Sequence, residues 1–302
     1  MQHLLKMSDL TDCEIIDILN LADQLKYEQK NYIEHSHLKG KTLGMIFNQP
    51  STRTRVSFEV GMIQLGGHPL FLSASDLQIE YGETMEDTAR VLSRYLDGIM
   101  IRTDRHEDVE RLAEYGLIPV INGLTSYAHP CQVLADLMTI REKKRTLKGL
   151  KAAYSGPGHS TLNSFIVGGL KAGLSVAVAS PGGYGPSRAV VEFAKSYGEK
   201  FSLCEKPEDA AKDADVILTD VWRSPRYKAG TQELAELMEK YQLNENLISY
   251  ARPGAIVLHR LPARKGEEIS EAVFESHAGE IFEEAENRLH VQKAVLLKLI
   301  GG

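Results

Sequence analysis

Short apolar runs alternate along most of the chain with longer segments in which apolar residues recur every three or four positions. The short runs are typical of strands buried on both faces, and the longer segments are typical of amphipathic helices. Regular alternation of the two predicts an α/β fold built on a parallel sheet. In the first half we predict strands at 42–47, 68–73, 97–101 and 117–122, with helices beginning near Thr52, Glu86 and Glu107.

Two further helices frame this first half. A capping box formed by Thr11 and Glu14 predicts a helix that runs to about Lys30. A long helix begins near Pro130 and leads into the basic stretch REKKRTLKG, after which the alternation restarts. This restart predicts a second domain. Its strands are expected at 151–155, 174–180, 201–204, 214–220 and 254–260.

The complete pattern predicts two doubly wound α/β domains, each with a parallel sheet. We place the first domain at 1–130 and the second at 131–282, with the helix at 130–142 as the connector. A final helix at about 283–299 is long enough to return to the first domain, to which we assign 283–302. The length of 302 residues agrees with two domains, because single hydrophobic cores stop growing at about 250–300 residues.

The charge balance limits the classes of partner. A net charge of −6 disfavours non-specific binding to nucleic acid or to an anionic membrane. Any phosphate must therefore be recognised in a local pocket. No apolar stretch approaches the ~18 residues that span a bilayer, and the amino terminus lacks the long apolar segment of a signal peptide. We expect a cytoplasmic protein without nucleic-acid or membrane partners.

The sequence gives no sign of a metal or a nucleotide cofactor. Cys13, Cys131 and Cys204 are scattered, without a CxxC pair, and are expected to be free thiols. No HExxH motif or Cys/His cluster is present. The glycines at 156–158 follow a predicted strand, as in nucleotide-binding folds, but the third glycine of that fingerprint is missing. We therefore expect no cofactor and treat a nucleotide-binding enzyme as a weak alternative.

The stretch PSTRTRVSFE at 50–59 carries the strongest chemical signal. Residues 51–55 hold three hydroxyl and two guanidinium side chains and no acid, and a helix is predicted to begin at Thr52. Unpaired backbone N–H groups and the positive end of the helix dipole favour an anion at such a place. Guanidinium forks suit phosphate oxygens. A capped helix with solvated arginines is the alternative, but the density of donors favours a phosphate site.

The stretch PSTRTRVSFE also resembles the carbamoyl-phosphate signature of the aspartate and ornithine carbamoyltransferases. Further motifs of that family follow in order and at family spacing over nearly the whole chain. The sequence DTARVLSRY at 87–95 is closer to the ornithine enzymes than to the aspartate enzymes. The other motifs are MIRT (100–103), HPCQVLADL (129–137), TDVW (219–222), HRLP (259–262) and FEEAENRLH (282–290).

The resemblance implies transfer of a carbamoyl group from carbamoyl phosphate to an amine. It implies that the phosphate is held by Ser51, Thr52, Arg53 and Thr54. Arg102 is expected to span phosphate and carbonyl, His129 to donate to the carbonyl oxygen and Gln132 to accept from the carbamoyl nitrogen. Backbone carbonyls near Arg260 and Leu261 are expected to hold the same nitrogen, with Arg288 closing the site.

Gln78 matches a family position that reaches the site of a neighbouring subunit. The resemblance therefore implies a homotrimer, or a multiple of trimers, with shared active sites. On this reading the catalytic roles fall on Arg102, His129, Gln132 and Arg260.

The acceptor half departs from the ornithine enzymes at several points. Asp220, which matches the family residue for the α-amino group of ornithine, is kept. Arg260 stands where the family has a cysteine. The Ser-Met-Gly loop of the family is replaced around Arg223, Ser224 and Arg226, and Ser160 stands in place of an asparagine. We assign all six of these residues to acceptor binding: Asp220, Ser224, Ser160, Arg223, Arg226 and Arg260.

An arginine beside the attacking amine changes the expected acceptor. Two unit cations ~4 Å apart repel by about 4 kcal/mol at an effective dielectric of 20. Either the acceptor carries an anion near its amine or Arg260 swings away, and the loop arginines favour the first option. We therefore expect ornithine to be a poor substrate and a shorter or more acidic amine to be preferred. The alternatives are a genuine ornithine carbamoyltransferase that makes citrulline and a non-catalytic homologue that binds carbamoyl phosphate.

Overall fold

The computed structural model describes residues 1–78, 82–158, 160–222 and 237–301. The chain forms two compact units. The first unit comprises Met1–Ala135 and Asn287–Gly302, and the second comprises Asp136–Glu286. Each unit contains one parallel sheet, so the predicted α/β fold class is confirmed.

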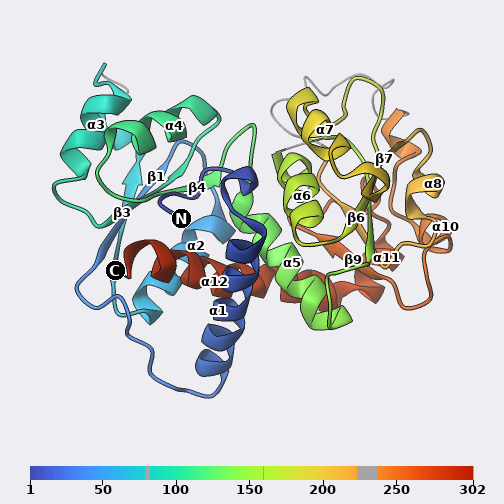
Figure 1. The fold of residues 1–302 in the computed structure, drawn as a ribbon, viewed down its shortest axis with the longest axis horizontal. Helices are drawn as coiled ribbons and strands as arrows, with labels where there is room; N and C mark the ends of the chain where they lie inside the picture. Colours follow the sequence, from blue (N-terminus) through green and yellow to red (C-terminus); the bar gives the residue numbers. More distant parts are fainter. Residues whose placement is uncertain (79–81, 159, 223–236, 302) are drawn as a thin grey trace. The chain divides into compact units, whose positions relative to one another are not determined.

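The first unit is built on a four-stranded sheet with the order β2-β1-β3-β4. All its strand pairs are parallel, and each crossover runs through a helix (Figure 1). The strands are β1 (Thr42–Phe47), β2 (His68–Ser73), β3 (Gly98–Arg102) and β4 (Val120–Leu124). The helices of its amino-terminal segment are α1 (Asp12–Lys30), α2 (Thr52–Gln64), α3 (Met85–Leu92) and α4 (His106–Tyr115), with short 3-10 turns η1 (Met7–Asp9) and η2 (Ala74–Asp76).

Strand β2 corrects one sequence expectation. The run HPLFLS is apolar enough to predict a buried strand, but β2 forms the edge of the sheet and pairs only with β1 among the described strands. Leu70 and Phe71 are 46% and 36% exposed. The central strands β1 and β3, by contrast, are almost completely buried. Apolar composition alone does not distinguish an edge strand from a central one.

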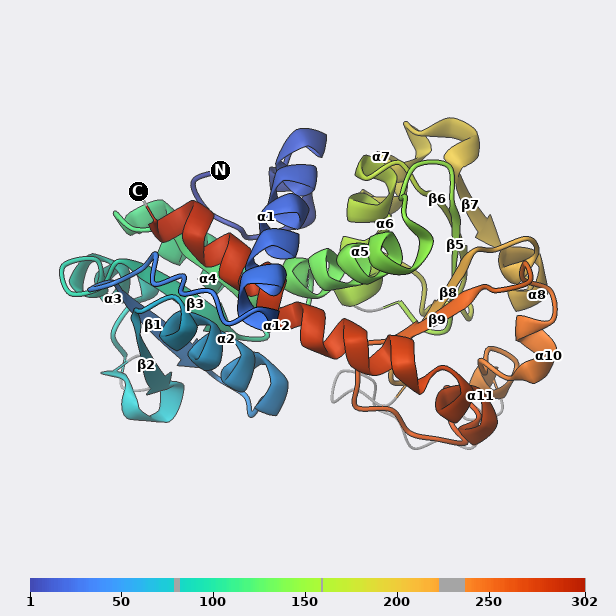
Figure 2. The same cartoon turned by 90° about the horizontal axis from the view of Figure 1, so that it is seen from below.

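Helix α12 (Ala278–Ile300) supplies the carboxyl-terminal part of the first unit from Asn287 onward. Within this unit it packs beside α1 and α2 (Figure 2). Lys26 of α1 donates to the side-chain oxygen of Asn287 at 2.8 Å. Gly61 of α2 leaves room for α12, because an added Cβ would lie 3.2 Å from the Lys293 side chain.

Lys293 is a cation that this packing buries completely, with 0% exposure. Its ammonium donates to the side-chain oxygens of Gln29 and Gln64 at 3.4 and 3.1 Å, and it lies 2.6 Å from His35 Nε2. Burial lowers the pKa of Lys293 to about 8, against the opposing attraction of Glu28. The return of α12 to the first unit is therefore fixed by buried polar contacts as well as by apolar ones.

The second unit is built on a five-stranded parallel sheet with the order β7-β6-β5-β8-β9. The chain builds outward from β5 to β6 and β7, and then continues on the other side of β5 with β8 and β9. The topological switch point therefore lies between the carboxyl ends of β5 and β8, where open α/β sheets bind their ligands. The strands are β5 (Lys151–Ser155), β6 (Ser175–Ala179), β7 (Phe201–Cys204), β8 (Val216–Thr219) and β9 (Ile256–His259).

The helices of the second unit cover this sheet and complete its core. The core joins small alanines of the central strands to larger residues such as Leu243 and Ile281. Among the described helices, none is both long and apolar enough to cross a membrane. The unit contains α6 (Ser160–Lys171), α7 (Arg188–Lys195), η4 (Gly198–Lys200), α8 (Pro207–Ala211), α10 (Glu245–Ile248) and α11 (Glu271–Ser276), and α5 (Pro130–Lys144) contributes to both units.

Candidate active site

The amino terminus of α2 forms a strongly electropositive site in the first unit. Ser51 is the N-cap, and its hydroxyl accepts from the backbone N–H of Thr54 at 3.3 Å. Thr52 is the exposed first residue of the helix, and Arg53 follows it half-buried. The first turn of α2 carries no acid. No acidic side chain of this turn therefore neutralises the positive end of the helix dipole.

Two arginines from distant parts of the sequence converge on the hydroxyl of Thr54. Arg102 at the end of β3 donates from Nη1 at 3.4 Å, and Arg288 of α12 donates from Nη2 at 2.8 Å. Thr54 and Arg288 are 1% and 4% exposed. Parallel pairing of β1 with β3 sets Phe47 opposite Arg102, which brings the end of β3 beside the start of α2. Three residues predicted to bind carbamoyl phosphate, Thr54, Arg102 and Arg288, thus meet at one place.

Arg55, the second guanidinium of residues 51–55, does not join this group in the structure. Its Nε donates to Glu59 at 2.9 Å on the exposed face of α2. Its guanidinium also lies 3.7 Å from the centre of the Phe71 ring. Residues that share a helix face are three or four positions apart, so Arg53 and Arg55, which are two positions apart, point in different directions.

His129 and Gln132 lie at the amino terminus of α5, after the end of β4. Both are almost fully buried, with 2% and 1% exposure. Because β4 is the neighbour of β3, they follow the same edge of the sheet that carries Arg102. Cys131 between them is inert, since burial raises the pKa of its thiol to about 12 despite the positive charge of Arg288.

Gln78 lies on the exposed surface of the first unit, after η2. Its backbone carbonyl accepts from the N–H of Glu83 at 3.1 Å. Contact with a neighbouring subunit stays a prediction.

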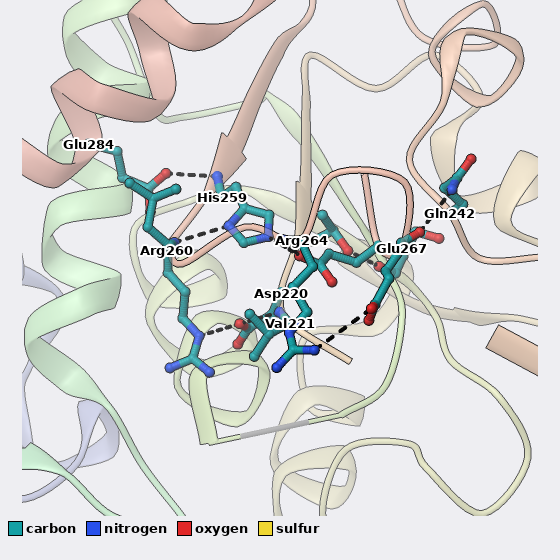
Figure 3. Close-up of polar contacts among 12 residues, drawn as sticks. Asp220, Val221, Gln242, His259, Arg260, Arg264, Glu267 and Glu284 are labelled. Carbon is teal, nitrogen blue, oxygen red and sulfur yellow. Dashed lines mark hydrogen bonds and ion pairs between the residues drawn. The ribbon is translucent and has the colours of Figure 1, made fainter. Parts of the chain in front are cut away.

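Asp220 and Arg260 meet in the second unit, at the carboxyl ends of β8 and β9 (Figure 3). Arg260 Nε donates to Asp220 Oδ1, and the backbone N–H of Val221 donates to the same oxygen at 2.6 Å. Asp220 is 1% exposed, whereas the side chain of Arg260 is 19% exposed. Burial disfavours the charged form of Arg260, but the Asp220 carboxylate outweighs it and holds the pKa of Arg260 above its usual value.

The loop that follows β9 has an unusual backbone that buried side chains hold in place. Leu261 has φ +57°, a conformation that a leucine rarely adopts, and a cis peptide bond joins it to Pro262. The N–H of Leu261 donates to His259 Nδ1 at 3.0 Å, so His259 carries its proton on Nε2 and donates it to Glu268 at 3.2 Å. Glu284 accepts from the backbone N–H of His259 at 2.9 Å (Figure 3). A positive φ at a leucine that neighbouring contacts hold in place is typical of functional sites.

The turn after β5 brings the backbone close to β8. Gly156 has φ +131°, and an added Cβ would meet Trp222 Nε1 at 3.3 Å and Thr219 Oγ1 at 3.4 Å. Ser160 begins α6 and is 2% exposed. The remaining acceptor predictions, Arg223, Ser224 and Arg226, lie outside the described residues.

A cavity of about 10 Å³, with room for about one water molecule, lies beside Arg260 within the second unit. Its lining includes residues to which the sequence had led us to assign no role. Asp136 follows the HPCQ motif and Glu284 lies in FEEAENRLH, so both stood within recognised motifs without an assigned role. The cavity is lined by Asp136, Tyr154, Thr161, Phe165, Leu218, Thr219, Leu258, Arg260 and Glu284.

Among the described residues, no group of His, Cys, Asp or Glu side chains could hold a metal ion.

In comparisons with known proteins, two family models match consecutive parts of the chain. Residues 2–142 match the family model "Aspartate/ornithine carbamoyltransferase, carbamoyl-P binding domain". Residues 148–299 match the model "Aspartate/ornithine carbamoyltransferase, Asp/Orn binding domain". The recognised resemblance is therefore confirmed.

Individual relatives are similar over almost their entire length. An ornithine carbamoyltransferase of Carboxydothermus hydrogenoformans is 52% identical over 301 residues, which cover 98% of this chain and 97% of the relative. The solved structure of an ornithine carbamoyltransferase from Pyrococcus furiosus superposes with a TM-score of 0.95 at 49% identity, covering 100% of this chain and 97% of the other. The corresponding structure from Thermus thermophilus gives 0.89 at 38% identity, with 99% of each chain covered.

Proposed function

Because the chain belongs to the aspartate/ornithine carbamoyltransferase family, we propose that it transfers the carbamoyl group of carbamoyl phosphate to the side-chain amine of ornithine. The observation that carries the carbamoyl-phosphate half is the convergence of Arg102 and Arg288 on Thr54 at the acid-free start of α2. The observation that supports ornithine is the name shared by relatives about half identical to this chain.

The first role we propose is binding of the phosphate group. The phosphate of carbamoyl phosphate is the leaving group, and its negative charge grows as the C–O bond breaks. Backbone N–H groups of α2, the hydroxyls of Ser51, Thr52 and Thr54, and the guanidinium of Arg53 are donors that suit this anion. Arg288 adds a buried cation that Thr54 already orients. These fixed donors lower the energy of the departing phosphate without needing to reorganise.

The second role is polarisation of the carbonyl group. Attack of the neutral amine on the carbonyl carbon forms a C–N bond and places negative charge on the carbonyl oxygen. The charge then moves to the phosphate as the C–O bond breaks, and the proton of the attacking amine passes to the departing phosphate. We propose that Arg102 and His129 donate to the oxygen, while Gln132 and the backbone carbonyl of Leu261 accept from the carbamoyl nitrogen. The rigid loop around Leu261 suits a carbonyl that must keep one direction.

We propose ornithine in place of the shorter or more acidic amine that the sequence led us to expect. The comparisons favour the genuine ornithine enzyme over an altered acceptor. One observation still supports the second candidate, a carbamoyltransferase for another amine. Arg260 donates a hydrogen bond to the carboxylate of Asp220. By the resemblance, this carboxylate is the group that binds the α-amino group of ornithine.

Turnover with a panel of amines tests the proposal. Purified protein is mixed with carbamoyl phosphate and with ornithine, putrescine, aspartate or a short diamino acid, and phosphate release above the amine-free rate is measured. We expect the highest kcat/KM with ornithine. Preference for another amine supports the second candidate, and release with none of them supports a non-catalytic homologue if carbamoyl phosphate still binds by calorimetry.

We further propose a homotrimer, or a multiple of trimers, in which Gln78 contributes to a neighbouring site. The exposure of Gln78 on the first unit is compatible with such a contact. Light scattering tests the assembly, and a monomer at assay concentration would contradict it.

A further inference from the structure

The carboxylate of Asp220 lies where an acceptor is expected to bind, yet it already holds a cation of its own chain. Asp220 follows β8 directly and thus stands at the switch point between β5 and β8, where ligands of open α/β sheets bind. The domain that contains it matches the model for Asp/Orn binding. An almost fully buried carboxylate at this place suits the ammonium group of an amino acid.

Arg260 reaches Asp220 from the neighbouring strand end. Parallel pairing of β8 with β9 sets Thr219 opposite His259, so the next residues of both strands, Asp220 and Arg260, emerge side by side. Their side chains point toward each other in Figure 3 and form an ion pair through Arg260 Nε and Asp220 Oδ1. This contact follows from the register of the sheet and does not depend on a long loop.

Other groups around Arg260 favour the same position. Asp136, Glu284 and the hydroxyl-bearing Tyr154 line the cavity that Arg260 also lines. Tyr154 and Asp136 add to the attraction by which Asp220 holds the pKa of Arg260 above its usual value. An acceptor carboxylate has to compete with them for Arg260, and an acceptor ammonium has to compete with Arg260 for Asp220.

We infer that Arg260 is a specificity-determining residue that takes the place of the acceptor's α-ammonium on Asp220. This inference rests on the proposed function in one respect, namely that the acceptor is an amino acid with a side-chain amine. An acceptor with an α-ammonium gains little from that group, because it binds Asp220 only by displacing a charge that is already hydrogen-bonded there. An acceptor without an α-ammonium leaves the ion pair between Arg260 and Asp220 intact and loses no binding free energy at this position.

Two acceptors that differ only in the α-ammonium provide the test. Ornithine and 5-aminopentanoate share chain length, carboxylate and reacting amine. The readout is the ratio of their kcat/KM values at saturating carbamoyl phosphate. We expect a ratio below ~10 for the wild type, and in Arg260→Met an increase of at least about 10-fold, the effect of one hydrogen bond to a charged group. Arg260→Lys keeps a cation beside Asp220 and is expected to stay near the wild-type ratio.

Arg252→Met is the matched control. Arg252 pairs with Asp215 at the opposite end of β8, at 3.1 Å, so this variant removes an arginine–aspartate pair from the same strand without touching the site. Its ratio is expected to equal the wild-type ratio. A wild-type ratio far above ~10 that Arg260→Met leaves unchanged overturns the inference.

A binding measurement separates this inference from the proposed function. Norvaline and pentanoate lack the reacting amine and differ only in the α-ammonium. Calorimetry with each, in the presence of carbamoyl phosphate, gives a ratio of dissociation constants that needs no turnover. If neither amine reacts but this ratio rises by at least about 10-fold in Arg260→Met, the proposed function fails and the role of Arg260 stands. An unchanged ratio, or no binding of norvaline to either protein, overturns the role of Arg260.

Discussion

Replacement of Arg288 by methionine probes the convergent cluster on Thr54 most directly. Arg288 Nη2 donates to the Thr54 hydroxyl at 2.8 Å, and the arginine is 4% exposed, so water does not screen its charge effectively. A hydrogen bond to a charged group contributes about 1.5–3 kcal/mol. If Arg288 offers the phosphate a bond of that class, Arg288→Met weakens binding of carbamoyl phosphate by about 10-fold to 150-fold.

Calorimetric titration with carbamoyl phosphate measures this loss, with circular dichroism to establish that the variant is folded. Arg55→Met is the matched control, because Arg55 belongs to the same signature stretch but pairs with Glu59 on the exposed face of α2. We expect the control to bind carbamoyl phosphate within about 2-fold of the wild type, less than ~0.5 kcal/mol. A folded Arg288→Met protein that binds as tightly as the wild type would refute the assignment of this cluster to phosphate binding.

Three further perturbations follow from buried groups. Lys293 has a folded-state pKa of about 8, below its ordinary value of 10.5, so it destabilises the fold below pH 8 and this penalty fades as the pH rises toward 10.5. Between pH 7 and about 9.5, the free energy of unfolding of the wild type should therefore rise by up to about 2 kcal/mol relative to that of Lys293→Met, as measured by denaturant melts. The same pH dependence in both proteins would contradict the buried charge. Glu268→Ala removes the acceptor of the His259 imidazole and should lower kcat/KM and the melting temperature together, with unchanged turnover counting against a positioning role. Gly158→Ala should destabilise by more than ~1 kcal/mol, because its Cβ would overlap the backbone oxygen of Gly185, whereas Gly182→Ala, with open space around it, should melt like the wild type.

The sequence predicted several strands of both sheets with their exact bounds, because short runs rich in apolar residues stand out between polar segments. Strands β1, β5 and β7 begin and end at the predicted residues. The prediction for β4 was displaced, from 117–122 to Val120–Leu124, because Leu117 is 81% exposed while Asn122 is buried. The side chain of Asn122 donates to two backbone carbonyls, one of them from the amino-terminal segment. A polar residue satisfied by a distant backbone leaves no mark in local periodicity.

In the candidate site, too, the features that depend on neighbouring residues were predictable, and those that depend on distant residues were not. Ser51 and Thr54 were recognisable because capping and donor density are local properties of the chain. The orientations of the arginines were not recognisable. Arg55 turns to Glu59 and Phe71, and Arg260 turns to a carboxylate that the register of β8 and β9 brings beside it. The sequence suggested a guanidinium ready for an anionic acceptor, whereas the structure shows one already held by Asp220.

The central claim is transfer of a carbamoyl group to ornithine, and following that carbon atom tests it most directly. The purified protein is incubated with carbamoyl phosphate labelled with ¹³C at the carbonyl and with ornithine, and the label is followed by NMR. We expect the signal to move to the ureido carbon of citrulline, at a rate proportional to protein concentration and absent without ornithine. If the label passes only to the products of spontaneous carbamoyl-phosphate breakdown, at the rate seen without protein, the claim is wrong.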